Sequence, residues 1–371
     1  MRTLIRDVRV FDTARTSARA DVLIDGDRIA EPDGRRADVE VDGTGRTLLP
    51  GLIDAHTHTF DGDLARALTF GVTTELDMFC LPPNLARQRR LAAERDDVAD
   101  LRSAGVLATA LGGHPAAVMA AVAPMLEHSA GAVGPFETLS DAAQAPAFVA
   151  ARAAEGSDYL KIVIDDGSTS GTSAPTLGAD VVKALVAAAH DAGLCAIAHI
   201  ATARDARTAL DAGVDGLAHL WSDTPPGDPA ADELVARIAA QGVFVISTLV
   251  YIEVIGGDDP RRLENASYVA GALHRAGVPL LAGTDATPFA PRHGDGLHRE
   301  LELLHQAGLT PSEALAASTG VPARHFSLAD RGRVAPGLRA DLVLVEGDPT
   351  RDITASRAIA AVWRRGVRLS R

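Results

Sequence analysis

The chain has 371 residues, of which 47% are hydrophobic and 23% are charged, and this composition excludes a disordered or fibrous protein. The 49 acidic residues outnumber the 36 basic ones and the arginines are scattered, so neither nucleic acid nor an anionic membrane is an expected partner. The length suits one large domain with a smaller companion.

The two ends of the chain share one character. Residues 1–48 alternate short strand patterns with turns rich in Gly and Asp, and residues 333–371 do the same. Neither piece is large enough to bury a core alone. We therefore predict that residues 1–48 and 333–371 pair into one small β-sandwich domain.

Residues 49–332 alternate short apolar strand patterns with longer amphipathic helical ones, several of which end at a glycine. Eight such repeats predict an α/β fold of the (β/α)8 TIM barrel type. A doubly wound open sheet is less favoured, because no glycine-rich phosphate loop follows the first strand. The predicted strands are 49–56, 72–79, 105–111, 159–164, 194–200, 214–220, 243–250 and 278–285, and the predicted helices include 86–95, 180–193, 202–213, 231–242 and 296–308.

One long connection, residues 111–158, breaks this alternation. Connections of that length inside a compact domain usually carry function. We therefore expect a lid or a substrate-binding loop in this part of the chain.

Titratable side chains recur where the predicted strands end, which is where barrels of this type form their active sites. Two histidines one residue apart point to the same side of a strand and, as neutral imidazoles, can share one metal ion. A lysine inside an apolar strand is costly unless it is paired or converted to a carbamate, which can bridge two ions. The residues concerned are His56, His58, Lys161, His199, His219 and Asp285.

Each of these residues also has a purely structural explanation. A strand-end histidine is often a hydrogen-bonded core residue, a lone strand lysine usually reaches solvent, and Thr-Asp after a strand is a common helix cap. The occurrence of all six on one rim favours a metal site. Asp54, on the face of the two histidines, is expected to orient an imidazole.

Six stretches resemble the amidohydrolase superfamily, and the resemblance covers essentially the whole chain. It is closest to members with two metal ions and a bridging carbamylated lysine, and the C-terminal tail and residues 200–219 resemble the imidazolonepropionase-like and prolidase-like branch. The stretches are 49-LPGLIDAHTH-58, 159-YLKIVID-165, 196-AIAHI-200, 216-GLAHL-220, 282-AGTDA-286 and 336-PGLRADLVLVEGDP-349.

The resemblance implies a ligand set for two divalent ions. His56, His58 and Asp285 would hold one ion, His199 and His219 the other, and a carbamate on Lys161 would bridge them. Zinc is the expected metal, although manganese, cobalt and iron suit the same ligands.

The implied reaction is hydrolysis of an amide, a lactam or an ester in a small molecule such as an N-acyl amino acid or a dipeptide. A hydroxide bridging the two ions would attack the carbonyl, with Asp285 as catalytic proton shuttle. One alternative is a deaminase or a cyclic amide or imidazolone hydrolase with a single metal, in which Lys161 has no role. A non-catalytic scaffold is a third, but such proteins lose ligands and this chain has all six.

Three residues are candidates for binding substrate. His114 lies in 112-GGHP-115, similar to a Gly-Gly-His segment of the related peptidases, Tyr251 follows the seventh predicted strand, and His293 lies in an exposed loop after Asp285. Each also has an explanation without a role in binding: His114 could be an ordinary loop histidine, Tyr251 could pack in the core, and His293 could lie in a solvated loop. Ala201 stands where those peptidases tend to carry an aromatic residue, which puts recognition of a C-terminal carboxylate in doubt.

The remaining signals concern location and assembly. The chain has two cysteines without CxxC spacing, which suits a reducing, cytoplasmic environment. It shows no signal-peptide pattern and no apolar stretch long enough to span a bilayer. Alanine-rich helices could pack against a second copy or face water, so a homo-oligomer is left open.

Overall fold

In the computed structural model all residues are described except 13–14, 127–130, 172, 257–258 and 371. Within this part of the chain, no helix is long and apolar enough to cross a membrane.

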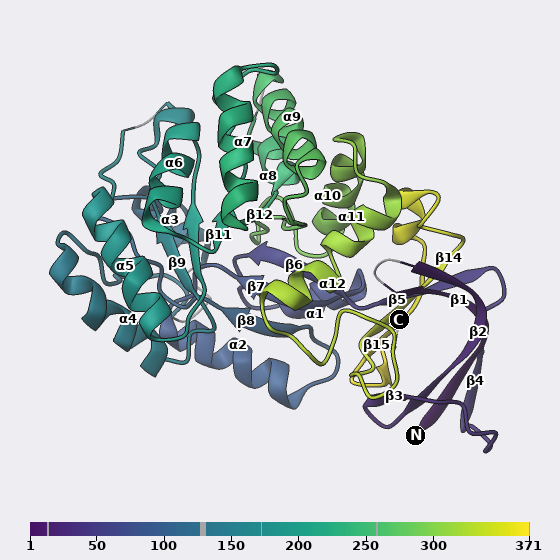
Figure 1. Ribbon diagram of the computed structural model, residues 1–371. Helices are drawn as coiled ribbons and strands as arrows, with labels where there is room; N and C mark the ends of the chain where they lie inside the picture. The colour runs from purple at the N-terminus through teal and green to yellow at the C-terminus, as the bar shows by residue number, and fades with distance from the viewer. Residues whose placement is uncertain (13–14, 127–130, 172, 257–258, 371) are drawn as a thin grey trace.

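Strands from both ends of the chain form a single eight-stranded sheet, which lies beside the two termini in Figure 1. Its order is β16-β15-β14-β5-β1-β2-β3, with β4 parallel to β1, and β14 is antiparallel to both β5 and β15. A separate apolar cluster, which includes Ile24 and Trp363, covers it. The strands are β1 (Arg2–Asp12), β2 (Arg15–Asp25), β3 (Arg28–Ala30), β4 (Val39–Asp42), β5 (Arg46–Pro50), β14 (Leu342–Glu346), β15 (Ile359–Arg364) and β16 (Val367–Arg368).

The middle of the chain forms two parallel sheets. One has the order β13-β12-β11-β10-β9 and the other β6-β7-β8. Isolated parallel bridges join Ala108, in the segment after β8, to Ile162, and Thr57 to Ala286, in the segment after β13, which is compatible with a closed barrel. The strands are β6 (Leu52–Thr57), β7 (Val72–Asp77), β8 (Asp100–Ser103), β9 (Leu160–Val163), β10 (Ala196–His199), β11 (Gly216–Ala218), β12 (Phe244–Ile246) and β13 (Leu280–Leu281).

Helices surround these strands, and several begin at capping residues or end at a glycine. The helix after β10, for example, starts at a capping box of Thr202 and Asp205 and ends at Gly213, whose φ of 84° favours glycine. The helices are α1 (Asp63–Thr69), α2 (Pro82–Glu94), α3 (Ala116–Val122), α4 (Ala145–Ala154), α5 (Ala179–Asp191), α6 (Ala203–Ala212), α7 (Pro229–Gln241), α8 (Leu249–Ile255), α9 (Arg261–Arg275), α10 (Asp295–Gln306), α11 (Pro311–Ala317) and α12 (Gly320–His325), with 3-10 turns η1 (Ala123–Leu126), η2 (Ala142–Gln144), η3 (Ser168–Ser170) and η4 (Ile353–Arg357).

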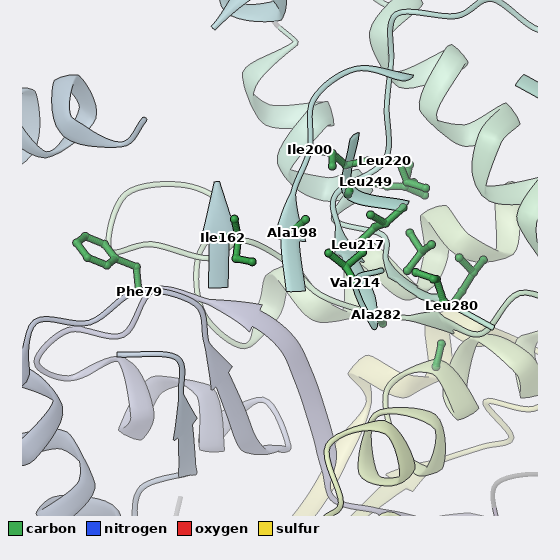
Figure 2. Close-up of a cluster of buried hydrophobic side chains, with 14 of the residues drawn as sticks. Phe79, Ile162, Ala198, Ile200, Val214, Leu217, Leu220, Leu249, Leu280 and Ala282 are labelled. Atoms are coloured by element: carbon green, nitrogen blue, oxygen red, sulfur yellow. The ribbon is translucent and has the colours of Figure 1, made fainter. Parts of the chain in front are cut away.

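The alternation of side chains along each strand separates the core from the site. Figure 2 shows Ile162, Ala198 and Leu217 on the neighbouring strands β9, β10 and β11, where they belong to the cluster packed against the helices. Because successive side chains point to opposite faces, Lys161 points away from this cluster. The apolar packing of Ile162 therefore fixes the direction of Lys161.

Two sequence-based expectations about these elements are wrong. The third strand is Asp100–Ser103 rather than 105–111, because Gly105 turns the chain at a φ of 66° and 105–111 forms only isolated bridges. The seventh strand ends at Ile246 and α8 begins at Leu249, because Thr248 adopts a left-handed φ of 49°. The long connection 111–158, which breaks the alternation, contains the helices α3 and α4.

Candidate metal centre

All six side chains predicted at the strand ends line one cavity. They come from strands that are far apart in the sequence, and the parallel arrangement brings the carboxyl ends of these strands to one side of the molecule. The six are His56, His58, Lys161, His199, His219 and Asp285.

Asp285 lies between the two histidines at the end of β6. Its Oδ1 is 3.3 Å from Nε2 of His56 and 3.0 Å from Nε2 of His58. Ligand atoms of His56, His219 and Asp285 all lie within 4.8 Å of one another, and the three side chains are buried. This cluster can hold a metal ion.

His199 and His219 form a second pair. Nδ1 of His199 is 3.0 Å from Nε2 of His219, and Nδ1 of His219 shares a 2.8 Å hydrogen bond with the hydroxyl of Thr248. Nε2 of His199 lies 3.5 Å from Asp165. Hydrogen-bonded partners of this kind fix the orientation of imidazole ligands.

The chemistry of these donors fits a divalent ion. Burial, followed by the positive neighbour Lys161, holds the pKa of His56 well below its usual value, and burial does the same for His219. Both rings are therefore in the neutral form that metals require. Tetrahedral coordination with bonds of about 2.1 Å places neighbouring ligand atoms about 3.4 Å apart, similar to the 3.0 and 3.3 Å found around Asp285.

Among the described residues, two buried nitrogen atoms of side chains that line the cavity have no hydrogen-bond partner, Nζ of Lys161 and Nδ1 of His56. Lys161 is only 2% exposed, and burial lowers its pKa to about 7. An unpaired buried amine is costly, and a lysine with a lowered pKa is partly uncharged and nucleophilic at neutral pH. These properties suit conversion to a carbamate.

The backbone at this site is in an unusual conformation. His219 and Asp285 have φ angles of 76° and 55°, in the left-handed region that non-glycine residues seldom adopt. Thr248, which bonds His219, has a φ of 49°. Such conformations cluster at functional sites, where the surrounding fold holds them.

Asp54 does not orient an imidazole, contrary to expectation. Its carboxylate accepts hydrogen bonds from the backbone N–H of His56 at 3.2 Å, and from the backbone N–H and hydroxyl of Thr284 at 3.0 and 2.6 Å. It therefore fastens β6 to the segment that carries Asp285.

Two of the three candidate substrate contacts line the cavity. The ring centroid of His114 is 4.8 Å from that of His199, and the ring of Tyr251, on α8, is 6.2 Å from that of His219.

His293 is different. Its loop is exposed at Phe289 and Arg292, as expected, but His293 itself is 1% exposed and its ring nitrogens lie 2.7 Å from Glu75 and 3.3 Å from Asp63. It is not among the residues that line the cavity, so it is not retained as a substrate contact.

Sequence reasoning missed Asp165 and Thr248, which contact the rings of His199 and His219. A signal for both was present, because Asp165 directly follows the predicted strand 159–164 and Thr248 is a polar residue near the end of the predicted strand 243–250. They were overlooked because aspartate and threonine are also ordinary residues for turns and helix caps.

The buried pair of His293 and Glu75 predicts a pH-dependent stability. Burial lowers the pKa of His293, but Glu75 and Asp63 outweigh it and raise that pKa to about 9. Since the folded-state pKa exceeds that of the unfolded chain, the stabilisation is complete below pH of about 6.5 and is lost as pH rises through about 9.

We expect His293→Gln to destabilise the fold by up to about 3 kcal/mol at acidic pH and by less at alkaline pH, measured by urea unfolding at about pH 6 and about pH 9.5. His190→Gln is the control, because the pair of His190 with Asp215 is exposed and should contribute little at either pH. A loss of unfolding free energy in His293→Gln that becomes larger as the pH rises would contradict the charged pair of His293 with Glu75.

Comparison with known proteins gives matches over nearly the whole chain. A family model described as the amidohydrolase family matches residues 47–369. The chain is 30% identical over 382 aligned residues to an imidazolonepropionase of Anaeromyxobacter dehalogenans, covering 88% of this chain and 83% of the relative.

Two solved structures share the fold. An Xaa-Pro dipeptidase with bound methionine superposes with a TM-score of 0.81 at 20% identity, covering all of both chains. Molinate hydrolase superposes with a TM-score of 0.82 at 18% identity, covering 100% of this chain and 94% of the other. At these identities the likeness is one of fold.

Proposed function

Because the chain belongs to the amidohydrolase family and is a hydrolase of carbon–nitrogen bonds, we propose that it cleaves an amide bond, or a lactam or ester, of a small molecule such as an N-acyl amino acid or a dipeptide. The observation that carries this proposal is the convergence of six metal-ligand side chains on one cavity. Imidazole and carboxylate groups, such as the four histidines and Asp285 described above, are the ligands that metal-assisted hydrolysis needs.

We infer that the two parallel sheets are one (β/α)8 barrel spanning 49–332, and that 1–48 and 333–371 form a separate small domain. The isolated parallel bridges of Ala108 with Ile162 and of Thr57 with Ala286 support closure of the barrel. The antiparallel pairing of β14 with β5 supports joining the two ends. In such a barrel the loops at the carboxyl ends of the strands make the active site, which is where the six donors lie.

Two divalent ions, with zinc the expected metal, would be held by the six donors. His56, His58 and Asp285 would hold one, His199 and His219 the other, and a carbamate on Lys161 would bridge them. When bound, the ions would supply a nucleophile from water at neutral pH and polarise the scissile carbonyl.

The protein's own groups would handle the proton and the substrate. Asp285, buried and 7% exposed, is the catalytic group that takes a proton during attack and delivers it to the leaving nitrogen. Tyr251, whose ring neighbours that of His219, and His114, whose ring neighbours that of His199, would hydrogen-bond the substrate. The buried surroundings strengthen these interactions by excluding water.

A second candidate is hydrolysis of a cyclic amide, or deamination, by the same site. It is supported by the similarity to a relative named imidazolonepropionase. Under this candidate one metal ion would suffice and Lys161 would stay an unmodified amine.

Lys161 provides the test, because the chain contains only two lysines, Lys161 and the exposed Lys183 on α5. We expect protein incubated with ¹³C-bicarbonate and zinc to show one carbamate signal by NMR. Lys161→Ala should remove the signal and lower the metal content, whereas Lys183→Ala should change neither. Full metal content and full activity in Lys161→Ala would contradict the two-metal site.

The reaction itself is assigned by a substrate panel. Zinc-loaded protein would be tested with N-acyl amino acids, dipeptides, lactones and cyclic ureas, with released amine, acid and ammonia scored separately. Amine release is expected. Ammonia release, or ring opening without free amine, would favour the second candidate.

A further inference from the structure

The wall of the cavity beyond the metal donors is strongly apolar. It is built from the start of α2, the segment 115–126 with α3 and η1, and the loop after Asp285. The apolar side chains are Phe60, Phe79, Leu81, Met119, Leu126 and Phe289, among others.

In the part of the wall that the structure describes, the charged groups are those of the metal donors. Among the described residues that line this cavity there is no arginine or glutamate, and the only lysine and aspartate are Lys161 and Asp285. A charged substrate group held against the apolar wall would therefore have no partner, and burying an unpaired charge is strongly unfavourable.

The segment 115–126 contributes apolar side chains to the wall of the cavity. None of the residues of α3 is buried, and Val118 is 49% exposed, yet Val118 and Met119 both line the cavity. Ile255 and Phe289, 39% and 40% exposed, line it as well. Large apolar side chains left exposed around a cavity mark a binding surface rather than ordinary protein surface.

A second, smaller cavity beside the same histidines has a less apolar wall. A smaller neighbouring cavity shares His199, His219 and Tyr251 with the apolar one, but its remaining wall includes Asp165 and Arg262. A substrate centred on the metal donors would thus extend into two unlike environments.

We infer that the substrate carries a bulky, uncharged apolar group, aryl or branched alkyl, on one side of the scissile bond. This group would lie between Phe79, Met119 and Phe289. The inference rests on the proposed hydrolase and narrows its substrate class: amides whose group on that side is acidic or basic would be poor ligands.

The test is a matched set of probes that differ in one group: 3-phenylpropanoyl-glycinamide, succinyl-glycinamide, which has a carboxylate in place of the phenyl ring, and β-alanyl-glycinamide, which has an ammonium. Binding is measured by calorimetry on the full-length chain after chelator treatment, with the fold checked by circular dichroism. We expect the phenyl probe to bind at least about tenfold more tightly than either charged probe.

Two methionines of one short segment provide matched variants. Met119 lines the cavity, whereas Met125 is 69% exposed and does not. Met119→Glu should weaken binding of the phenyl probe at least about tenfold, and Met125→Glu should leave it within about twofold. Met119→Lys should gain affinity for the succinyl probe, a result that misfolding cannot produce.

The outcomes separate this inference from the proposed function. Equal binding of a charged probe, no binding of the phenyl probe, or an unchanged Met119→Glu protein would overturn the inference, even if the zinc-loaded enzyme hydrolyses amides. Binding as expected, with no amide hydrolysed by the loaded protein, would uphold the inference and contradict the proposed function.

Discussion

Replacing Asp285 by Asn is expected to lower kcat for amide hydrolysis by about 10²- to 10⁴-fold, the usual loss when a proton-transfer group is removed. Asparagine keeps the shape of aspartate but cannot accept the proton. It also presents an amide where Oδ1 now lies near His56 and His58.

Asparagine is chosen because it suits the left-handed backbone conformation at position 285. Asp285 has a φ of 55°, and asparagine is one of the few residues that tolerate this region well. The variant should therefore fold like the wild type, and metal analysis beside kcat and KM shows whether binding of the ions or proton transfer is lost.

Asp295→Asn is the control for the loss of one negative charge. Asp295 is the first residue of α10, pairs with the partly exposed Arg66, and is not among the residues that line the cavity. This variant should retain wild-type kcat. An Asp285→Asn enzyme with more than about a tenth of wild-type kcat would contradict the role of Asp285.

Asp100→Asn is expected to destabilise the fold by about 3 kcal/mol, the low end of the loss for a broken buried ion pair, because it removes one of the three carboxylates, Asp100, Asp330 and Asp341, that neutralise a cluster of arginines. Asp100 lies 3.0 Å from Arg339 and 3.6 Å from Arg364, and also contacts Arg331. The side chains of Arg331 and Arg364 are 4% and 1% exposed. Among the described residues, Nε and Nη1 of Arg364 have no hydrogen-bond partner, although Nη1 lies 3.7 Å from Asp341, so Arg364 depends on its neighbouring carboxylates.

The effect is measured as the free energy of unfolding in urea. The control is Asp97→Asn, whose pair with Arg95 is about half exposed and should contribute almost nothing. A loss in Asp100→Asn no larger than in Asp97→Asn would show that the arginines do not depend on Asp100.

The ion pairs of Asp100 with its arginines also predict how the stability of the fold changes as the pH falls. Burial acts to raise the pKa of Asp100, but Arg331, Arg339 and Arg364 hold it below its usual value. Because the folded-state pKa is the lower one, this stabilisation is present above the pKa of the unfolded chain, about 3.9, and is lost as pH falls below it. The wild type should approach Asp100→Asn in stability as the solution is acidified.

The sequence located the six candidate donors but not the residues around them. Each donor stands out because a polar side chain at the end of an apolar strand pattern is conspicuous. His293 shows the limit of this reasoning: its loop contains proline and charged residues and looks exposed, yet its partner Glu75 lies 218 positions earlier in the chain. No local pattern indicates a contact over that separation.

By itself the sequence determined the alternation of strands and helices, the family, and six candidate donors that line one cavity, because local periodicity and strand-end position are properties of neighbouring residues. Only the tertiary structure decided the start of the third strand, the partners of Asp54 and His293, and the apolar wall that faces the donors. The reason is physical. Burial and pairing depend on which segments meet in space, and Phe79, Met119 and Phe289 share no pattern along the chain that would bring them to one cavity.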